Sequence, residues 1–167
     1  ADYTVIRSRR RTMALEVTRE GAALVRAPLR ASEADITRFV EEHRAWLDKH
    51  LAQRQAYLAV RRRLMEGARF TALFAISDNM AIGAMRALRE AGQQIPRDCS
   101  VIAVDGLALS QYTRPTLTTM CQPSDRMGEE SVRILLDMIE RRAGNRSLVL
   151  ESTLRAGASV APPDSRR

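Results

Sequence analysis

Residues 70–106 decide the fold, and their sequence is FTALFAISDNMAIGAMRALREAGQQIPRDCSVIAVDG. A short apolar run over residues 70–76 gives way to the polar Ser77-Asp78-Asn79, residue types that suit a helix N-cap after a strand. Residues 80–91 are rich in Ala, Met and Leu and predict a helix, and residues 100–104 form a second apolar run. This order predicts a β-α-β unit with two parallel strands and a right-handed crossover.

The residues that follow continue this alternation of strands and helices. Residues 116–121 are rich in β-forming types, residues 124–140 have the spacing of an amphipathic helix, and residues 148–154 predict a final strand. Residues 162–167 contain two prolines and end in two arginines, and we expect them to be a disordered tail.

The N-terminal part has a different pattern. Residues 4–6, 13–17 and 23–27 are short apolar or alternating runs with β-branched members, which predict a small antiparallel meander. Ser32 is a good N-cap for a long amphipathic helix, which the apolar spacing predicts over residues 33–65. The predicted fold class is therefore α/β, with a meander and a long helix followed by the parallel β-α-β unit.

Composition excludes several classes of protein. The 167 residues are 45% hydrophobic and 28% charged, values that are ordinary for a globular protein. No apolar run approaches the roughly 20 residues of a membrane span, and no signal peptide is visible, so we expect a cytoplasmic protein without a membrane anchor. Cys99 and Cys121 are too few for a disulfide framework and are expected to be reduced.

The positive charge is concentrated in the first part of the chain. Residues 1–65 carry 14 basic and 8 acidic side chains, a net charge of +6, whereas residues 66–167 carry a net charge of +1. The clusters at residues 9–11 and 61–63 could attract nucleic acid phosphates, but no aromatic residues are interleaved with them for base stacking. A solvated hairpin edge and a solvated helix surface explain them better, so direct DNA binding is not expected.

Residues that suit metal or phosphate chemistry are few. His43 and His50 are seven residues apart on one predicted helix, too far apart to bind one zinc ion without further ligands, and we interpret them as solvated. Gly83 lies inside a predicted helix, where it permits close packing rather than the approach of a ligand. We therefore expect no metal, no cofactor and no enzymatic activity.

Several ordered blocks resemble the effector-binding region of the LacI/GalR family of bacterial transcription regulators. Their order and spacing match the last part of that region, over about residues 57–160. The matching blocks are residues 74–85, Gly92, Ile95-Pro96, residues 100–106, residues 114–119, Gln122-Pro123 and Met127-Gly128. The resemblance implies a lobe with the periplasmic-binding-protein fold, without the DNA-binding head of the family.

Residues 2–55 resemble a different family, the opening of YgjP-like metallopeptidases. The blocks concerned are residues 3–17, residues 25–28 and the helix with Phe39-Val40 and Trp46-Leu47. The defining His-Glu-x-x-His zinc motif of that family is absent. We therefore interpret the chain as a hybrid: residues 1–56 form a YgjP-like segment, residues 57–161 a truncated LacI-type lobe, and residues 162–167 a tail. A zinc hydrolase fragment is the alternative function.

The LacI/GalR resemblance places Ser77, Asp78 and Asp105 at an effector site. Regulators of this type bind a sugar or a purine there, and ligands of open α/β sheets lie outside the carboxyl ends of the strands. The same residues have a simpler explanation, in which Ser77 or Asp78 caps a helix and Asp105-Gly106 forms a turn. We favour that explanation and expect little residual binding of a sugar or nucleobase, because the opposite wall of the cleft is not recognisable.

The apolar residues at 116–121 and 124–140 have two interpretations. In the LacI/GalR family the carboxyl-terminal lobe contributes to a symmetric dimer, so exposed apolar area would serve self-association. The other interpretation is core packing within one chain. The predicted function is a truncated or chimeric LacI/GalR-type sensor region that self-associates.

Overall fold

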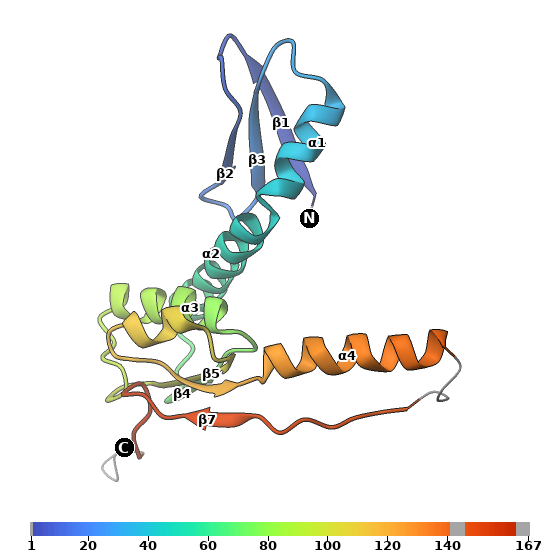
Figure 1. Ribbon diagram of the computed structural model, residues 1–167. Coiled ribbons are helices and arrows are strands. Elements are labelled where there is room, and N and C mark those ends of the chain that lie inside the picture. The colour runs from blue at the N-terminus through green and yellow to red at the C-terminus, as the bar shows by residue number, and fades with distance from the viewer. Residues whose placement is uncertain (1, 141–145, 163–167) are drawn as a thin grey trace.

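The computed structural model describes residues 2–140 and 146–162, and Figure 1 shows them as an L-shaped molecule. A β-sheet unit at the N-terminal end is joined by a long helix to a second unit built on another sheet. The elements in chain order are β1 (Tyr3–Ser8), β2 (Ala14–Val17), β3 (Ala23–Pro28), α1 (Glu33–Glu42), α2 (Arg44–Met65), β4 (Ala72–Phe74), α3 (Asp78–Glu90), β5 (Ser100–Asp105), η1 (Ala108–Tyr112), β6 (Thr118–Cys121), α4 (Ser124–Ile139) and β7 (Thr153–Arg155).

The first sheet has the strand order β1-β3-β2. The predicted antiparallel meander is wrong in one pairing: β2 and β3 form an antiparallel hairpin, but β1 pairs parallel to β3. The reason is the burial of β3, in which Ala23, Leu24, Val25 and Ala27 are all buried. Such a strand is covered on its faces and bonded at both edges, so it takes the centre of the sheet.

The predicted long helix is two helices in the structure, with a break at His43. The backbone of His43 leaves helical geometry at φ −108° and ψ 14°, and its N–H donates to the carbonyl of Val40. The break lets α1 bury Ile36 and Val40 against the first sheet, while α2 continues in another direction toward α3 (Figure 1). A single straight helix could not cover both surfaces.

Helix α2 contributes to two separate cores. Its first half packs Leu47 and Leu51 into the first core, beneath the three-stranded sheet. Its second half packs Val60 and Leu64 against the second core, whose largest buried members include Met85. The helix therefore joins the two units.

The second sheet confirms the predicted β-α-β unit. Its strand order is β4-β5-β6-β7; β4, β5 and β6 are parallel, and β7 is antiparallel to β6. Helix α3 buries Ala81, Met85 and Leu88 against this sheet. Cys99 and Cys121 are free thiols, as predicted, and burial raises the pKa of Cys99 to about 11.

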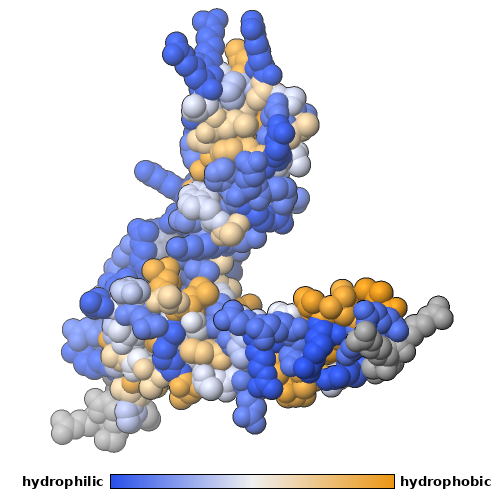
Figure 2. All heavy atoms as spheres, viewed as in Figure 1, coloured by the Kyte–Doolittle hydropathy of each residue, from blue (hydrophilic) through white to orange (hydrophobic). Residues whose placement is uncertain are grey.

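Helix α4 and residues 146–152 form an arm that projects from the second sheet (Figure 1). The helix has no buried residue, and hydrophobic side chains are exposed along the arm in Figure 2. The predicted strand over residues 148–154 is largely wrong, since only Thr153–Arg155 pair with a neighbour. Residues 148–152 include an apolar run but do not pair with a neighbouring strand, and a β-strand requires such a pairing partner. Residues 163–167 of the predicted tail lie outside the described residues.

Candidate functional site

Ser77, Asp78 and Asp105 lie together at the carboxyl ends of β4 and β5, as the β-α-β prediction requires. Ser77 is the N-cap of α3, and its Oγ accepts the backbone N–H of Met80 at 3.2 Å. The backbone N–H of Asp78 donates to Asp105 Oδ2 at 3.2 Å. The helix start and the strand end are thus joined by one hydrogen bond.

Asp78 is fully buried and both of its carboxylate oxygens are occupied. Oδ1 accepts the hydroxyl of Thr119 at 2.5 Å, and Oδ2 accepts the backbone N–H of Leu107 at 2.7 Å. A carboxylate with these partners ties α3 to β6 and to the loop after β5. Its oxygens are not available to a ligand, and the helix cap is supplied by Ser77 rather than by Asp78.

Asp105 has a different environment from Asp78. It is only partly buried, and its backbone has a φ of 129°, the one positive φ of a non-glycine residue among those described. Burial raises the pKa of its carboxyl; the N–H of Asp78 offsets part of that effect, and the charge of Asp78 adds to it. A positive φ at a residue with a side chain is a form of backbone strain, and a glycine at this position would relieve it. Strained residues of this kind are concentrated at functional sites, where the side chain itself is needed.

The turn after Asp105 is held tightly by residues that sequence reasoning missed. A Cβ added at Gly106 would lie 2.6 Å from Cys121 Sγ, and φ there is +81°. Arg155 on β7 donates to the carbonyls of Gly106 at 3.2 Å and Leu107 at 2.8 Å. The side chain of Asp105 is therefore presented from a rigid turn, which favours a fixed polar contact.

The other sequence candidates remain on the surface. His43 is exposed and its Nδ1 bonds to the carbonyl of Phe39, and His50 stacks on Trp46. The described residues include no group of three or more His, Cys, Asp or Glu side chains that could hold a metal ion. Most of the arginines at residues 9–11 and 61–63 are exposed. No helix among the described residues is long and apolar enough to span a membrane.

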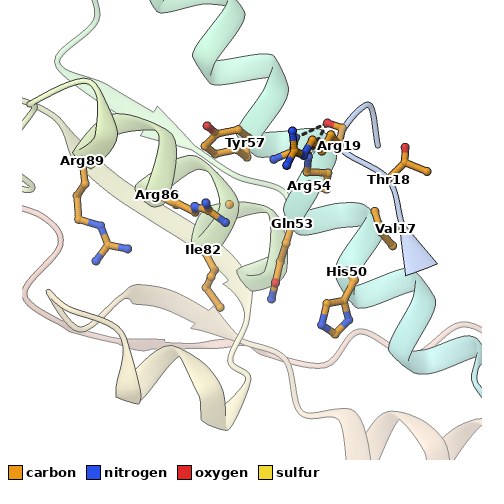
Figure 3. A pocket seen from close by; sticks show the side chains of 11 residues that line it. Val17, Thr18, Arg19, His50, Gln53, Arg54, Tyr57, Ile82, Arg86 and Arg89 are labelled. Atoms are coloured by element: carbon orange, nitrogen blue, oxygen red, sulfur yellow. Dashed lines mark hydrogen bonds between the residues drawn. The ribbon is translucent and has the colours of Figure 1, made fainter. Parts of the chain in front are cut away.

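A pocket lies between the turn after β2 and the helices α2 and α3 (Figure 3). Its volume is about 480 Å³. It is lined by Val17, Thr18, Arg19, His50, Gln53, Arg54, Tyr57, Ile82, Gly83, Arg86 and Arg89. These residues come from three separate parts of the sequence, and the sequence analysis did not identify this pocket.

A parallel β-α-β sheet with polar side chains at the carboxyl ends of its strands defines the class of open α/β ligand-binding lobes. Residues 1–160 match the periplasmic binding protein-like domain, and the chain belongs to that family.

Its relatives include transcription regulators. The chain is 38% identical over 99 residues to the HTH-type transcriptional regulator MalR of Clostridium butyricum, covering 59% of this chain and 30% of the relative. It is 36% identical over 110 residues to the ribose operon repressor of Haemophilus influenzae, covering 65% of this chain and 33% of the relative. The chain therefore spans about a third of the length of these curated relatives.

Solved structures give the same fold. The dimeric Lac repressor with an 11-residue C-terminal deletion is 30% identical with a TM-score of 0.64, covering 68% of this chain and 42% of that one. The transcriptional regulator CelR in its complex with cellobiose is 33% identical with a TM-score of 0.59, covering 62% and 32%. The predicted periplasmic-binding-protein-like lobe is thus confirmed. The resemblance of residues 2–55 to YgjP-like metallopeptidases gains no support, since the matched family extends across them.

Proposed function

We propose that the described second unit is the effector-binding lobe of a LacI/GalR-type transcription regulator, and that Asp105 is its main ligand contact. The observation that carries this proposal is the position of Asp105, a partly exposed carboxylate on a strained and braced turn at the carboxyl end of β5. Ser77, half-buried beside it, supplies a hydroxyl. Asp78 positions both residues rather than touching the ligand.

The ligand class is a small hydroxylated molecule, with a sugar preferred to a nucleobase. A carboxylate and a serine hydroxyl can accept and donate hydrogen bonds to neighbouring hydroxyl groups. Similar structures contain bound sugars, such as cellobiose in CelR and ribose in a LacI-family regulator from Enterococcus faecium. Only one wall of a cleft is present in the described residues, so we expect weak binding.

The first prediction concerns Asp105→Asn. Ribose and cellobiose are expected to bind the chain weakly, with a Kd of about 1 mM or above. A Kd of 1 mM corresponds to a binding free energy of roughly −4 kcal/mol. The amide introduced by this substitution retains the shape but not the charge of the carboxylate, so binding is expected to disappear. Titration of each sugar into the parent chain and the variant, followed by two-dimensional NMR, would measure binding through the chemical shift changes of the backbone amides at positions 77 and 105.

A matched variant controls for general effects of charge. Asp125→Asn removes one carboxylate from the exposed first turn of α4, far along the chain from the site, and is expected to leave sugar binding unchanged. If neither sugar nor nucleobase shifts the amides around Asp105 in the parent chain, the proposed effector site is refuted.

We further propose that α4 mediates self-association. Val132, Leu135, Leu136 and Ile139 recur at helical spacing on one side of α4 and are all exposed. Exposed apolar area of this kind marks an interaction surface. The comparison with a dimeric Lac repressor supports a second copy as the partner.

The second prediction tests this surface with Leu135→Glu. The parent chain is expected to form a dimer in sedimentation velocity at high protein concentration, and the variant is expected to be a monomer, because a charge cannot be buried there without a partner. Arg126→Gln changes the net charge by the same amount from a different side of α4 and should leave the dimer intact. A parent chain that stays monomeric at every concentration would refute the proposal.

We also propose that residues 1–56 and 57–161 fold as distinct units of the chain. Two separate buried clusters support this division. Hydrogen exchange would contradict it if amides in both clusters opened with one common free energy.

A further inference from the structure

The pocket between the β2–β3 turn, α2 and α3 is strongly basic. Four arginines line it, Arg19, Arg54, Arg86 and Arg89, and no acidic residue does. They come from the turn, from α2 and from α3, so chain segments far apart in the sequence contribute charges to one pocket. Arg89 lies at the end of the pocket away from Arg19 and Arg54 (Figure 3). Such a concentration of like charge in a hollow attracts an anion.

Two of these guanidinium groups are held in place by neutral partners. Arg54 Nε donates to the carbonyl of Arg19 at 2.8 Å, and its Cζ lies 4.9 Å from the centre of the Tyr57 ring. Arg89 donates to the carbonyl of Arg114 at 2.9 Å. Carbonyls and an aromatic face orient the guanidinium groups without cancelling their charge.

Two carboxylates near the pocket compensate part of this charge, Glu20 and Glu90. Hydrogen bonds to its own backbone and to Thr18 lower the pKa of Glu20, and the charges of Arg54 and Arg19 add to this effect. Glu90 bonds to Arg86 Nε at 2.8 Å and to the Tyr57 hydroxyl at 2.6 Å, and these hydrogen bonds lower the pKa of Glu90. The side chain of Arg19 has no hydrogen-bond or ion-pair partner among the described residues. The pocket therefore keeps an excess of positive charge that its own chain does not neutralise.

The remaining lining indicates the kind of anion. Guanidinium groups approaching from several sides match a phosphate, which offers three oxygens and accepts two hydrogen bonds from one guanidinium. His50 uses Nδ1 for the carbonyl of Trp46, which leaves Nε2 for another partner, while Val17 and Ile82 add apolar wall. About 480 Å³ is more space than a phosphate alone fills and suits a small organic molecule.

We propose that this pocket binds a small organic phosphate, whose phosphate group lies among Arg19, Arg54 and Arg86 and whose polar body contacts His50 and Gln53. The site is separate from Ser77 and Asp105, and it does not depend on the function proposed for them. Its position between the first unit and the α2–α3 pair means that a bound phosphate would connect the two units.

Isothermal titration calorimetry of the full chain at physiological salt tests the proposal. The probes are ribose 5-phosphate, inorganic phosphate and ribose. We expect ribose 5-phosphate to bind most tightly, inorganic phosphate more weakly, and ribose not to bind at this pocket. Asp105→Asn should not change the phosphate binding, which distinguishes this site from the proposed sugar site.

Two pocket variants and one control identify the residues. Arg19→Gln removes no hydrogen bond or salt bridge among the described residues and should weaken ribose 5-phosphate binding about tenfold, the loss expected for one charge-assisted hydrogen bond. Arg86→Gln should have a similar effect, and circular dichroism checks its fold. Arg9→Gln removes the same charge from an exposed position outside the pocket and should have no effect. Equal losses in all three variants, or no binding of ribose 5-phosphate to the parent chain, would overturn the proposal.

Discussion

Gly83→Ala is expected to lower the free energy of unfolding by about 3 kcal/mol, at the upper end of the usual cost of overpacking. Gly83 lies in α3 where it crosses α2, and a Cβ built there would be 2.0 Å from the carbonyl oxygen of Gln53 and 2.8 Å from its carbonyl carbon. These are backbone atoms of a helix and cannot rotate away. The two helices would have to separate along their whole contact.

Urea denaturation followed by circular dichroism measures this effect, and Gly128→Ala is the matched control. Gly128 lies inside α4, and a Cβ there would have no atom within 4 Å. The same substitution should therefore be neutral or stabilising, by up to about 1 kcal/mol from helix propensity. If the Gly83 variant were as stable as the parent chain, α2 and α3 would not be packed as closely as the structure has them.

The features that were predictable from the sequence are those set by local pattern. The apolar runs around residues 70–76 and 100–104 predicted two parallel strands, and the polar Ser77 predicted the N-cap between them. The close packing at Gly83 was also predicted. Glycine destabilises the interior of a helix, so its presence there indicates that the helix packs closely against a neighbour. Each of these inferences depends on residues close together in the chain.

The features that were missed depend on partners far apart in the chain. Nothing in residues 3–8 indicates whether β1 joins β2 or the far edge of β3. The break at His43 follows from the need to cover two sheets, which residues 33–65 do not reveal by themselves. Apolar residues at 148–152 predicted a strand, but a ladder also needs a neighbour.

The same distinction separates the two sites. Parallel strands place their carboxyl ends at one edge, so the proximity of Ser77, Asp78 and Asp105 could be predicted without a structure. The basic pocket could not be predicted in this way. Arg19 lies before the first helix, and it lines the same pocket as Arg86 only because α2 packs on α3. The spacing of Arg86 and Arg89 on one helix face was the only local signal for it.

Asp78→Ala is expected to lower the free energy of unfolding by about 3 kcal/mol, because it leaves buried donors without acceptors at roughly 1–3 kcal/mol each. The fully buried carboxylate accepts from the Thr119 hydroxyl and from the N–H of Leu107. Removing it also frees the loop that carries Asp105, so sugar binding should be lost together with stability. Urea denaturation of the variant measures the free energy of unfolding, and NMR titration measures sugar binding.

Two further variants separate the hydrogen bonds of Asp78 from its volume. In Asp78→Asn the amide oxygen can accept the N–H of Leu107, and the Thr119 hydroxyl can rotate to accept from the new NH₂ group. This variant should therefore lose less stability than Asp78→Ala, while Thr119→Val should leave Asp78 Oδ1 unpaired and fall between the two. If Asp78→Ala were as stable as Asp125→Ala on exposed α4, the buried carboxylate would not join α3 to β6, and Asp105 would lose the support that makes it a defined ligand contact.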